Sequence, residues 1–309
     1  MRVRCLLPLA AFAASCAREP AQQSAEATAA MADPHTGHAM TELSGAVVFD
    51  PMSTVQGTAG IPAGAADAAA RLSVSTRHGE WVKIAWESGS SDSLMAWVVY
   101  PETNNKAPVV VVIHEIFGLS TWVRGVADQL AADGFIAVAP DLLSRLRGGP
   151  SADELRSDSA TKLIRSVSVA EMNSGVYAAA QYGLALPAAR KKYGVVGYCW
   201  GGSATFNHAV FNSRQFGGGV VYYGTSTARD SMPRIKAPVL GLYGGNDARV
   251  NATIGPADST MRALKKSYVY SIFEGAGHGF LRAQDQPANL EAAKKAWPLT
   301  IAFFRKNLK

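Results

Sequence analysis

Cysteine is scarce in this chain of 309 residues, which contains only Cys5, Cys16 and Cys199. Three cysteines at such uneven spacing are too few for a disulfide framework or a zinc site. Charged residues are also sparse at 17%, whereas hydrophobic residues make up 48%. A chain of this length and composition can bury a sizeable core, so a disulfide miniprotein and disorder throughout are both excluded.

The sequence also lacks a concentrated basic tract of the kind that binds nucleic acid. Its formal charge is +6, from 30 Lys and Arg against 24 Asp and Glu, but the basic residues are scattered along the chain. No nucleic-acid-binding motif accompanies them. No metal, nucleotide or other cofactor is implied by the sequence. We expect the partner to be a small-molecule substrate and the protein to be a monomer.

The apolar run nearest the N-terminus is too short to cross a bilayer. It covers residues 6–14, follows Arg2 and Arg4, and is typical of an export signal. The small residues 13–15 precede Cys16, a pattern at which bacterial lipoprotein precursors are cleaved before the cysteine is lipidated. Plain cleavage nearby is the alternative. We expect residues 1–15 to be a lipoprotein signal peptide, and the mature protein to be periplasmic or in the cell envelope, touching the membrane only through a lipid on Cys16.

Residues 16–45 have the composition of a flexible tether. They are rich in Ala, Gln, Ser, Glu and Thr and show no apolar periodicity. His35 and His38 lie in this stretch; metal capture is conceivable, but two histidines in such a segment are more often linker residues. We therefore assign residues 46–309 to one folded domain.

Strand and helix patterns alternate along that domain. Residues 80–86 and 94–100 predict two strands that pair locally, and the run VVVVI within residues 108–113 predicts a strand buried on both faces. Further strands are expected at 135–139, 194–197, 218–223, 239–243 and 268–273, with helices at 121–132, within 153–184, and at 201–211, 256–265 and 290–308. Pro298 predicts a kink or boundary in the last helix. The alternation favours a single α/β domain with a mostly parallel, doubly wound sheet and helices on both faces.

The segment Gly197-Tyr198-Cys199-Trp200-Gly201-Gly202 lies between a predicted strand and a predicted helix. It matches the glycine-x-nucleophile-x-glycine elbow of α/β-hydrolases, with Cys in the place of Ser. The turn is sharp enough to need glycines, and we expect it to leave the thiol exposed above the sheet at a helix N-terminus, where the helix dipole favours thiolate. A small buried cysteine in a glycine-rich turn is the alternative.

Two later segments favour the catalytic interpretation. Asp247 follows the strand that ends near Tyr243, and His278 follows the strand that ends near Phe273. Open α/β sheets place ligands at the carboxyl ends of their strands, and the order Cys199, Asp247, His278 is the hydrolase order of nucleophile, acid and base. Each residue alone could be an ordinary loop residue. Together they predict that His278 takes the thiol proton and later protonates the leaving oxygen, while Asp247 fixes the histidine tautomer.

The segment His114-Glu115-Ile116-Phe117-Gly118 follows the long central strand. An acyl-transfer oxyanion needs preorganised N–H donors, and we expect the backbone N–H groups of Trp200 and Ile116 to supply them. Glu115 is either a surface residue or a carboxylate that accepts the Cys199 proton and controls when the thiolate exists.

These four segments, HEIFG, GYCWGG, the Asp247 turn and GAGHGF, resemble the signature blocks of the dienelactone hydrolase family in order and spacing. The resemblance implies an α/β-hydrolase fold, a Cys, Asp, His triad, and a glutamate at Glu115 that holds the resting thiol until substrate binds. It also implies arginines that bind the carboxylate of a cyclic enol-lactone. Arg282, four residues after His278, matches one such position, whereas Arg145, Arg147 and Arg156 lie near the other without aligning cleanly.

The sequence therefore predicts a carboxylic ester hydrolase that opens an ester or lactone through a Cys199 thioester. A general carboxylesterase or thioesterase of the same fold is the alternative within enzymes. A catalytically idle binding protein is the alternative outside them. For Arg282, the alternative to substrate binding is a surface ion pair with Asp285.

Overall fold

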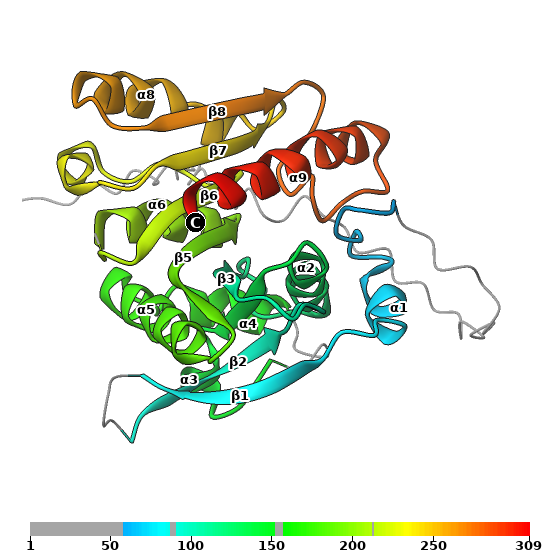
Figure 1. The fold of residues 1–309 in the computed structure, drawn as a ribbon. Helices are drawn as coiled ribbons and strands as arrows, with labels where there is room; N and C mark the ends of the chain where they lie inside the picture. Colours follow the sequence, from blue (N-terminus) through cyan, green and yellow to red (C-terminus); the bar gives the residue numbers. More distant parts are fainter. Residues whose placement is uncertain (1–57, 87–90, 152–156, 212) are drawn as a thin grey trace, which may run out of the picture. The chain divides into compact units, whose positions relative to one another are not determined.

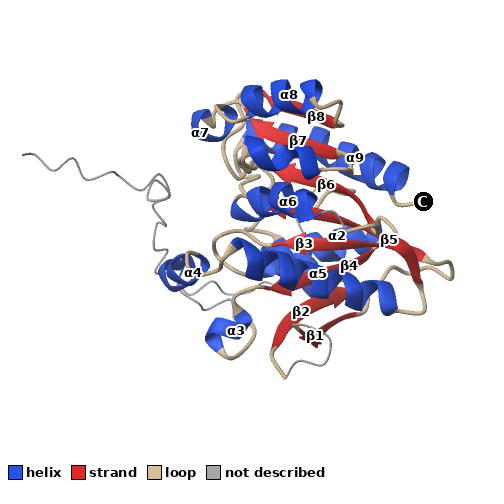
Figure 2. Ribbon diagram, turned by 90° about the vertical axis from the view of Figure 1, so that its left-hand side faces the viewer, coloured by secondary structure: helices blue, strands red, loops and turns tan. Residues whose placement is uncertain are grey.

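The computed structural model describes residues 58–86, 91–151, 157–211 and 213–309. The predicted signal peptide, Cys16 and the predicted tether lie outside these residues, as does Arg156. Eight strands form one sheet in the order β1-β2-β4-β3-β5-β6-β7-β8 (Figures 1 and 2). The strands are β1 (Gly79–Ala85), β2 (Ser93–Val99), β3 (Ala107–Ile113), β4 (Ile136–Asp141), β5 (Ala189–Tyr198), β6 (Phe216–Tyr222), β7 (Val239–Gly244) and β8 (Tyr268–Phe273).

The sheet is mostly parallel. β1 pairs with β2 and β2 with β4 in antiparallel register, whereas the six strands from β4 to β8 along the sheet all pair in parallel. This confirms the predicted fold class and the local pairing of the first two strands. Parallel neighbours need crossover connections, and the helices between the strands supply them.

Helices cover both faces of this sheet. One hydrophobic cluster joins the sheet to α1 (Ala68–Ser73), α2 (Thr121–Ala132), α4 (Ser157–Ile164) and α9 (Pro287–Asn307). A second cluster on the other face joins it to α5 (Val169–Ala185), α6 (Trp200–Phe211) and α8 (Ile254–Ala263). The short elements α3 (Ser144–Arg147), η1 (Arg229–Arg234) and α7 (Ala248–Asn251) lie in connecting segments. No helix in the described part of the chain has the length and apolar character needed to cross a membrane.

The central strand β3 is continuously apolar because it is buried on both faces. Val110 and Val112 face the first cluster, whereas Val109, Val111 and Ile113 face the second. All five are fully buried. A strand covered by helices on both sides has no polar face, so the period-two alternation of an exposed sheet disappears.

Most expected elements agree with the structure to within a few residues, but two differ in extent. β5 begins at Ala189, well before the predicted start. Its first half is exposed and carries the charged residues Arg190, Lys191 and Lys192, so it lacks the apolar pattern that predicts a buried strand. α9 runs through Pro298 as one helix of 21 residues, so the predicted boundary there is wrong. Burial of Trp297 and Ile301 against the sheet outweighs the backbone hydrogen bond that proline cannot donate.

Candidate active site

The elbow around Cys199 occupies the turn from β5 into α6. Cys199 has a left-handed backbone with φ of 56°, a strained conformation for a residue with a side chain. A Cβ on Gly197 would lie 2.0 Å from the Gly201 oxygen, and a Cβ on Gly201 would lie 2.4 Å from the Ile113 oxygen. Both glycines are therefore required by close backbone approach. The Cys199 N–H donates to the Tyr222 carbonyl at 3.1 Å, which holds the turn against the end of β6.

The thiol is less accessible than we expected. Cys199 is only 8% exposed and belongs to the buried cluster that also contains Ile116 and Tyr223. A reacting group must therefore enter a largely enclosed site.

Asp247 and His278 are in direct contact. The His278 Nδ1 lies 2.6 Å from the Asp247 Oδ2. Asp247 is 7% exposed and its other oxygen accepts the Val250 N–H at 3.3 Å, so the carboxylate caps α7 and is held in place. Burial lowers the pKa of His278, but the hydrogen bond to Asp247 and contact with the Cys199 thiol outweigh burial and raise this pKa to about 9. His278 therefore holds two protons at neutral pH and faces both partners.

Glu115 and Arg282 form the second polar contact of the site. The Arg282 Nε lies 2.9 Å from the Glu115 Oε2, and the Glu115 side chain is only 4% exposed. Burial raises the pKa of Glu115, whereas the charges of Arg282 and His278 act in the opposite direction. The guanidinium of Arg282 also lies over the Phe117 ring at 5.3 Å. The structure thus pairs Arg282 with Glu115 and not with Asp285.

The loop after β3 is tied to the elbow by His114. The Leu142 N–H donates to the His114 Nε2 at 3.2 Å, so Nδ1 carries the proton and donates to the Glu115 carbonyl at 2.7 Å. The His114 ring stacks on the Trp200 ring with centroids 5.9 Å apart. Ile116 and Trp200, the two expected oxyanion donors, therefore lie in segments that pack against each other, and their role stays a prediction.

Tyr223 was missed by the sequence analysis. It has φ of 39°, is fully buried, and its ring meets the His278 ring edge to face at 5.1 Å. Within the described residues the hydroxyls of Tyr223 and Tyr198 have no hydrogen-bond partner, and burial raises the pKa of both well above the usual range. A tyrosine at the end of a β-rich run is an ordinary strand residue, so the sequence carried no signal for this position.

Two of the three unaligned arginines have acidic partners away from Arg282. Arg145 pairs with Asp92 and Glu171, and Arg147 pairs with Asp141 at 2.6 Å. The third, Arg156, lies outside the described residues. A second substrate-binding arginine is therefore not assigned.

Comparison with known proteins identifies the family of the chain. The sequence model described as "Dienelactone hydrolase family" matches residues 94–308. The chain belongs to the dienelactone hydrolase family.

Relatives and solved structures support the same assignment. The chain is 30% identical over 237 residues to a Methylorubrum extorquens protein named "Putative carboxymethylenebutenolidase", covering 73% of this chain and 80% of the relative. It resembles the crystal structure titled "Putative Dienelactone Hydrolase" from Klebsiella pneumoniae with a TM-score of 0.64 and 25% identity, covering 74% of this chain and 99% of the other. The dienelactone hydrolase structure from Anabaena variabilis has the same fold, with a TM-score of 0.58, 21% identity and the same 99% coverage of that chain, against 75% of this one. The protein is thus a hydrolase of this family with the α/β-hydrolase fold.

The contact with Asp247 predicts how His278 titrates. In Asp247→Asn the charged acceptor is lost while burial remains, so the His278 pKa should fall from about 9 to near or below its ordinary 6.5. NMR titration of the histidine ring carbons measures this. Because the folded pKa is raised, His278 stabilises the folded protein fully below pH 6.5 and loses that contribution as pH rises through 9. That pH dependence of the unfolding free energy should vanish in the variant.

The matched control is Asp258→Asn, which removes the partly buried carboxylate partner of Arg262 on α8. His278 should titrate there as in the unsubstituted protein. An unchanged His278 pKa in Asp247→Asn would contradict the assigned contact.

Proposed function

We propose that the protein hydrolyses an ester or lactone with Cys199 as nucleophile, His278 as proton carrier and Asp247 as its orienting acid. The observation that carries the proposal is the strained Cys199 elbow facing the hydrogen-bonded His278 and Asp247 pair at one edge of the sheet. A strained turn persists only where the surrounding structure maintains it, and such turns cluster at active sites.

The reaction divides into two acyl transfers. The Cys199 sulfur attacks the substrate carbonyl carbon, and the oxyanion accepts hydrogen bonds from the Ile116 and Trp200 N–H groups. The carbon–oxygen bond of the ester breaks, His278 protonates the leaving oxygen, and a thioester remains on Cys199. His278, now neutral, takes a proton from water as that water attacks the thioester carbonyl. The carbon–sulfur bond then breaks, and the leaving Cys199 sulfur receives that proton from His278. The products are a carboxylic acid, an alcohol or enol, and the free thiol.

The raised pKa of His278 bears on how the thiol proton is removed. The charge of Cys199 is one of the causes of that raised pKa, so the doubly protonated histidine and the thiolate stabilise each other. A second base is needed only where His278 already holds two protons beside a neutral thiol. Glu115 suits this role because it is buried and its pKa is raised by burial. Its carboxylate is occupied by Arg282 in the structure. A substrate carboxylate that binds Arg282 would release Glu115 toward the thiol and so couple binding to thiolate formation.

This coupling favours a substrate that carries its own carboxylate, such as a dienelactone. The side chain of Arg282 is 27% exposed, so a carboxylate can approach it from solution. An arginine offers two parallel donors to a carboxylate, which would fix one end of the substrate and leave its carbonyl over Cys199. A general carboxylesterase would not need this contact.

We also propose that the protein is exported and tethered to a membrane through Cys16. The support is the sequence pattern of residues 1–15 and the tether composition that follows. A hydrolase held in the cell envelope would act on substrates outside the cytoplasm.

Cys199→Ala should lower kcat/KM by on the order of a thousandfold or more, because no other group supplies the acyl acceptor. The control is Cys16→Ser, which should retain full activity. Mass spectrometry of the unsubstituted protein, quenched with acid during turnover, should find the acyl group on the peptide that contains Cys199. Full activity of Cys199→Ala with an intact fold would refute the thioester mechanism.

Arg282→Ala should separate the two enzyme classes. A hydrogen bond to a charged group contributes roughly 1.5–3 kcal/mol, so kcat/KM for a carboxylate-bearing lactone should fall about 10- to 100-fold, while a neutral ester is hardly affected. Arg262→Ala, an exposed arginine in a surface ion pair, serves as the control. Because the variant strands Glu115 without its partner, Arg282→Ala should also be measured with Glu115→Gln. Equal losses for both substrates would mark a general esterase.

The tether predicts the chemical state of the mature N-terminus. Mass spectrometry of protein isolated from the membrane fraction should find an N-terminus at Cys16 with acyl chains attached. Substitution Cys16→Ser should remove the acyl chains and weaken attachment to the membrane without loss of hydrolase activity. An unmodified mature N-terminus at another residue would reject lipid attachment and leave the hydrolase proposal untouched.

A further inference from the structure

The sheet edge opposite the candidate active site is strongly basic beside β5 to β8. Cys199, Asp247 and His278 follow the carboxyl ends of parallel strands, so the segments that precede β5, β6, β7 and β8 lie at the other edge. In Figure 2, α3 and α7, which follow β4 and β7, lie at the left, and the C-terminus of the chain lies at the right. The end of α9 reaches the start of β6, where a Cβ on Gly217 would lie 2.9 Å from the Asn307 oxygen.

Five segments form the part of this edge beside β5 to β8: residues 186–192, 213–217, 234–239, 264–268 and 305–309. The part beside β3 and β4 also carries acids, because Glu102 precedes β3 and Asp133 precedes β4. Together the five segments contain eleven Lys and Arg and no Asp or Glu. We call these eleven residues the basic face: Arg190, Lys191, Lys192, Arg214, Arg234, Lys236, Lys265, Lys266, Arg305, Lys306 and Lys309. Removing them from the 30 Lys and Arg leaves 19 against 24 Asp and Glu, so the rest of the chain has a formal charge of −5. Eleven positive charges are therefore concentrated in the part of this edge beside β5 to β8.

These cations are available to an outside partner. All except the partly buried Lys266 are exposed. Among the residues that the structure describes, none of the eleven forms an ion pair with an acidic side chain. Arg190 and Arg305 each donate to a backbone carbonyl, of Lys106 and Asp133. Like charges held together without counterions repel each other, so an anionic partner would relieve that repulsion.

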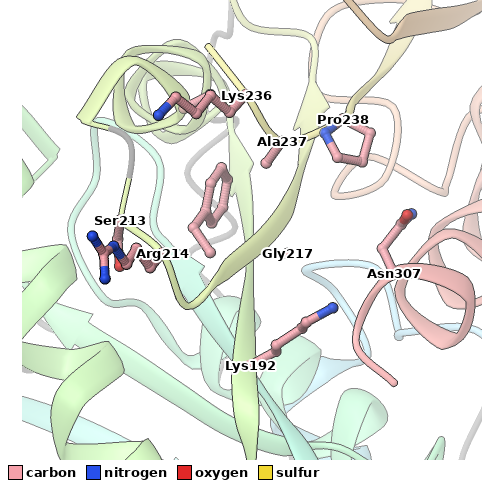
Figure 3. A pocket seen from close by; sticks show the side chains of 10 residues that line it. Lys192, Ser213, Arg214, Gly217, Lys236, Ala237, Pro238 and Asn307 are labelled. Atoms are coloured by element: carbon pink, nitrogen blue, oxygen red, sulfur yellow. The ribbon is translucent and has the colours of Figure 1, made fainter. Parts of the chain in front are cut away.

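A cleft opens in the middle of this face. It has a volume of about 510 Å³ and is lined by Lys192, Arg214 and Lys236, among other residues, with no acidic residue in its wall. Figure 3 shows these three cations arranged around the cleft, each coming from a different segment. A site of this size and charge suits the phosphate of a lipid headgroup, and the surrounding cations would meet neighbouring headgroups.

We propose that the basic face docks on a membrane surface rich in anionic phospholipid, with the cleft taking one phosphate headgroup. Charge complementarity favours this occupant because the cations spread across five segments, a footprint that fits an extended anionic surface better than a single small anion. No base-reading motif accompanies them, which argues against nucleic acid. Seven of the eleven are lysines, whose long flexible stems adapt to mobile headgroups.

Docking through the basic face would set the orientation of the candidate active site relative to the membrane. The basic face lies at the amino ends of the parallel strands and the candidate active site at the carboxyl ends, so a docked protein turns the site away from the membrane. Substrate would then enter from solution and not from the bilayer. A lipid on Cys16 would add a second attachment, and two weak attachments hold a protein far better than one.

The test measures binding of the full chain to vesicles. Every protein carries Cys16→Ser, so that no acyl anchor masks the effect. The cleft variant combines Lys192→Glu, Arg214→Glu and Lys236→Glu. The matched control combines Lys83→Glu, Lys162→Glu and Lys295→Glu, three exposed lysines outside the basic face with the same change of net charge.

The protein with the unsubstituted basic face should bind phosphatidylglycerol vesicles more tightly than phosphatidylcholine vesicles, and salt should weaken that binding. The cleft variant should bind phosphatidylglycerol vesicles about 100-fold more weakly, whereas the control should change far less. Thermal unfolding, independent of any enzyme assay, verifies that both variants fold, and hydrolysis in free solution should be the same in both.

Four results would overturn the proposal. Equal losses in the two variants would mean that only net charge matters. If the protein with the unsubstituted basic face bound anionic and neutral vesicles equally, an anionic membrane would not be its partner. Inorganic phosphate that binds the cleft in calorimetry, without vesicle binding, would identify a small-anion site. Duplex DNA bound as tightly as the vesicles, and lost in the same variant, would indicate a general polyanion surface.

Discussion

The close approach of the β5–α6 turn to the end of β3 is the constraint on which the site depends. Gly201 packs so near the Ile113 and His114 carbonyls that any side chain would collide with backbone. That approach forces Cys199 into a left-handed conformation and brings it beside the loop that carries Glu115 and Ile116. Because the backbone atoms on both sides are fixed by the sheet, the strain cannot relax without parting two central strands.

Two polar pairs then fill the space above the strand ends. His278 with Asp247 and Glu115 with Arg282 are each joined at hydrogen-bonding distance and each contain a buried carboxylate. A buried charge without a partner is costly, so each pair is stable only while both members are present. An exchange of partners, in which a substrate carboxylate takes the place of Glu115, costs less than creating a new charge in the site. This is why the proposed release of Glu115 is physically accessible.

The two edges of the parallel sheet carry different groups of residues. Loops at the carboxyl ends bring together Cys199, Asp247, His278 and the Glu115 and Arg282 pair, as expected for the ligand-binding edge of an open α/β sheet. The segments that precede β5 to β8 bring together cations without acids. A parallel sheet separates these edges by the length of its strands, so the proposed attachment surface and the proposed catalytic site can occupy one small domain without interfering.

Much of this protein could be predicted from the sequence because the patterns involved are local. The apolar run of β3, the glycines around Cys199 and the turn residues around Asp247 and His278 each act through neighbours in the chain, and strand direction alone places them at one edge. What only the tertiary structure decided involves residues far apart in the chain. The sequence suggested Asp285 as an alternative partner for Arg282, yet folding pairs Arg282 with Glu115, because the loop after β3 meets the loop after β8. Tyr223 became part of the site for the same reason, since β6 ends beside His278. Eleven basic residues that are scattered along the sequence gather on one face, because parallel strands return every amino end to the same edge.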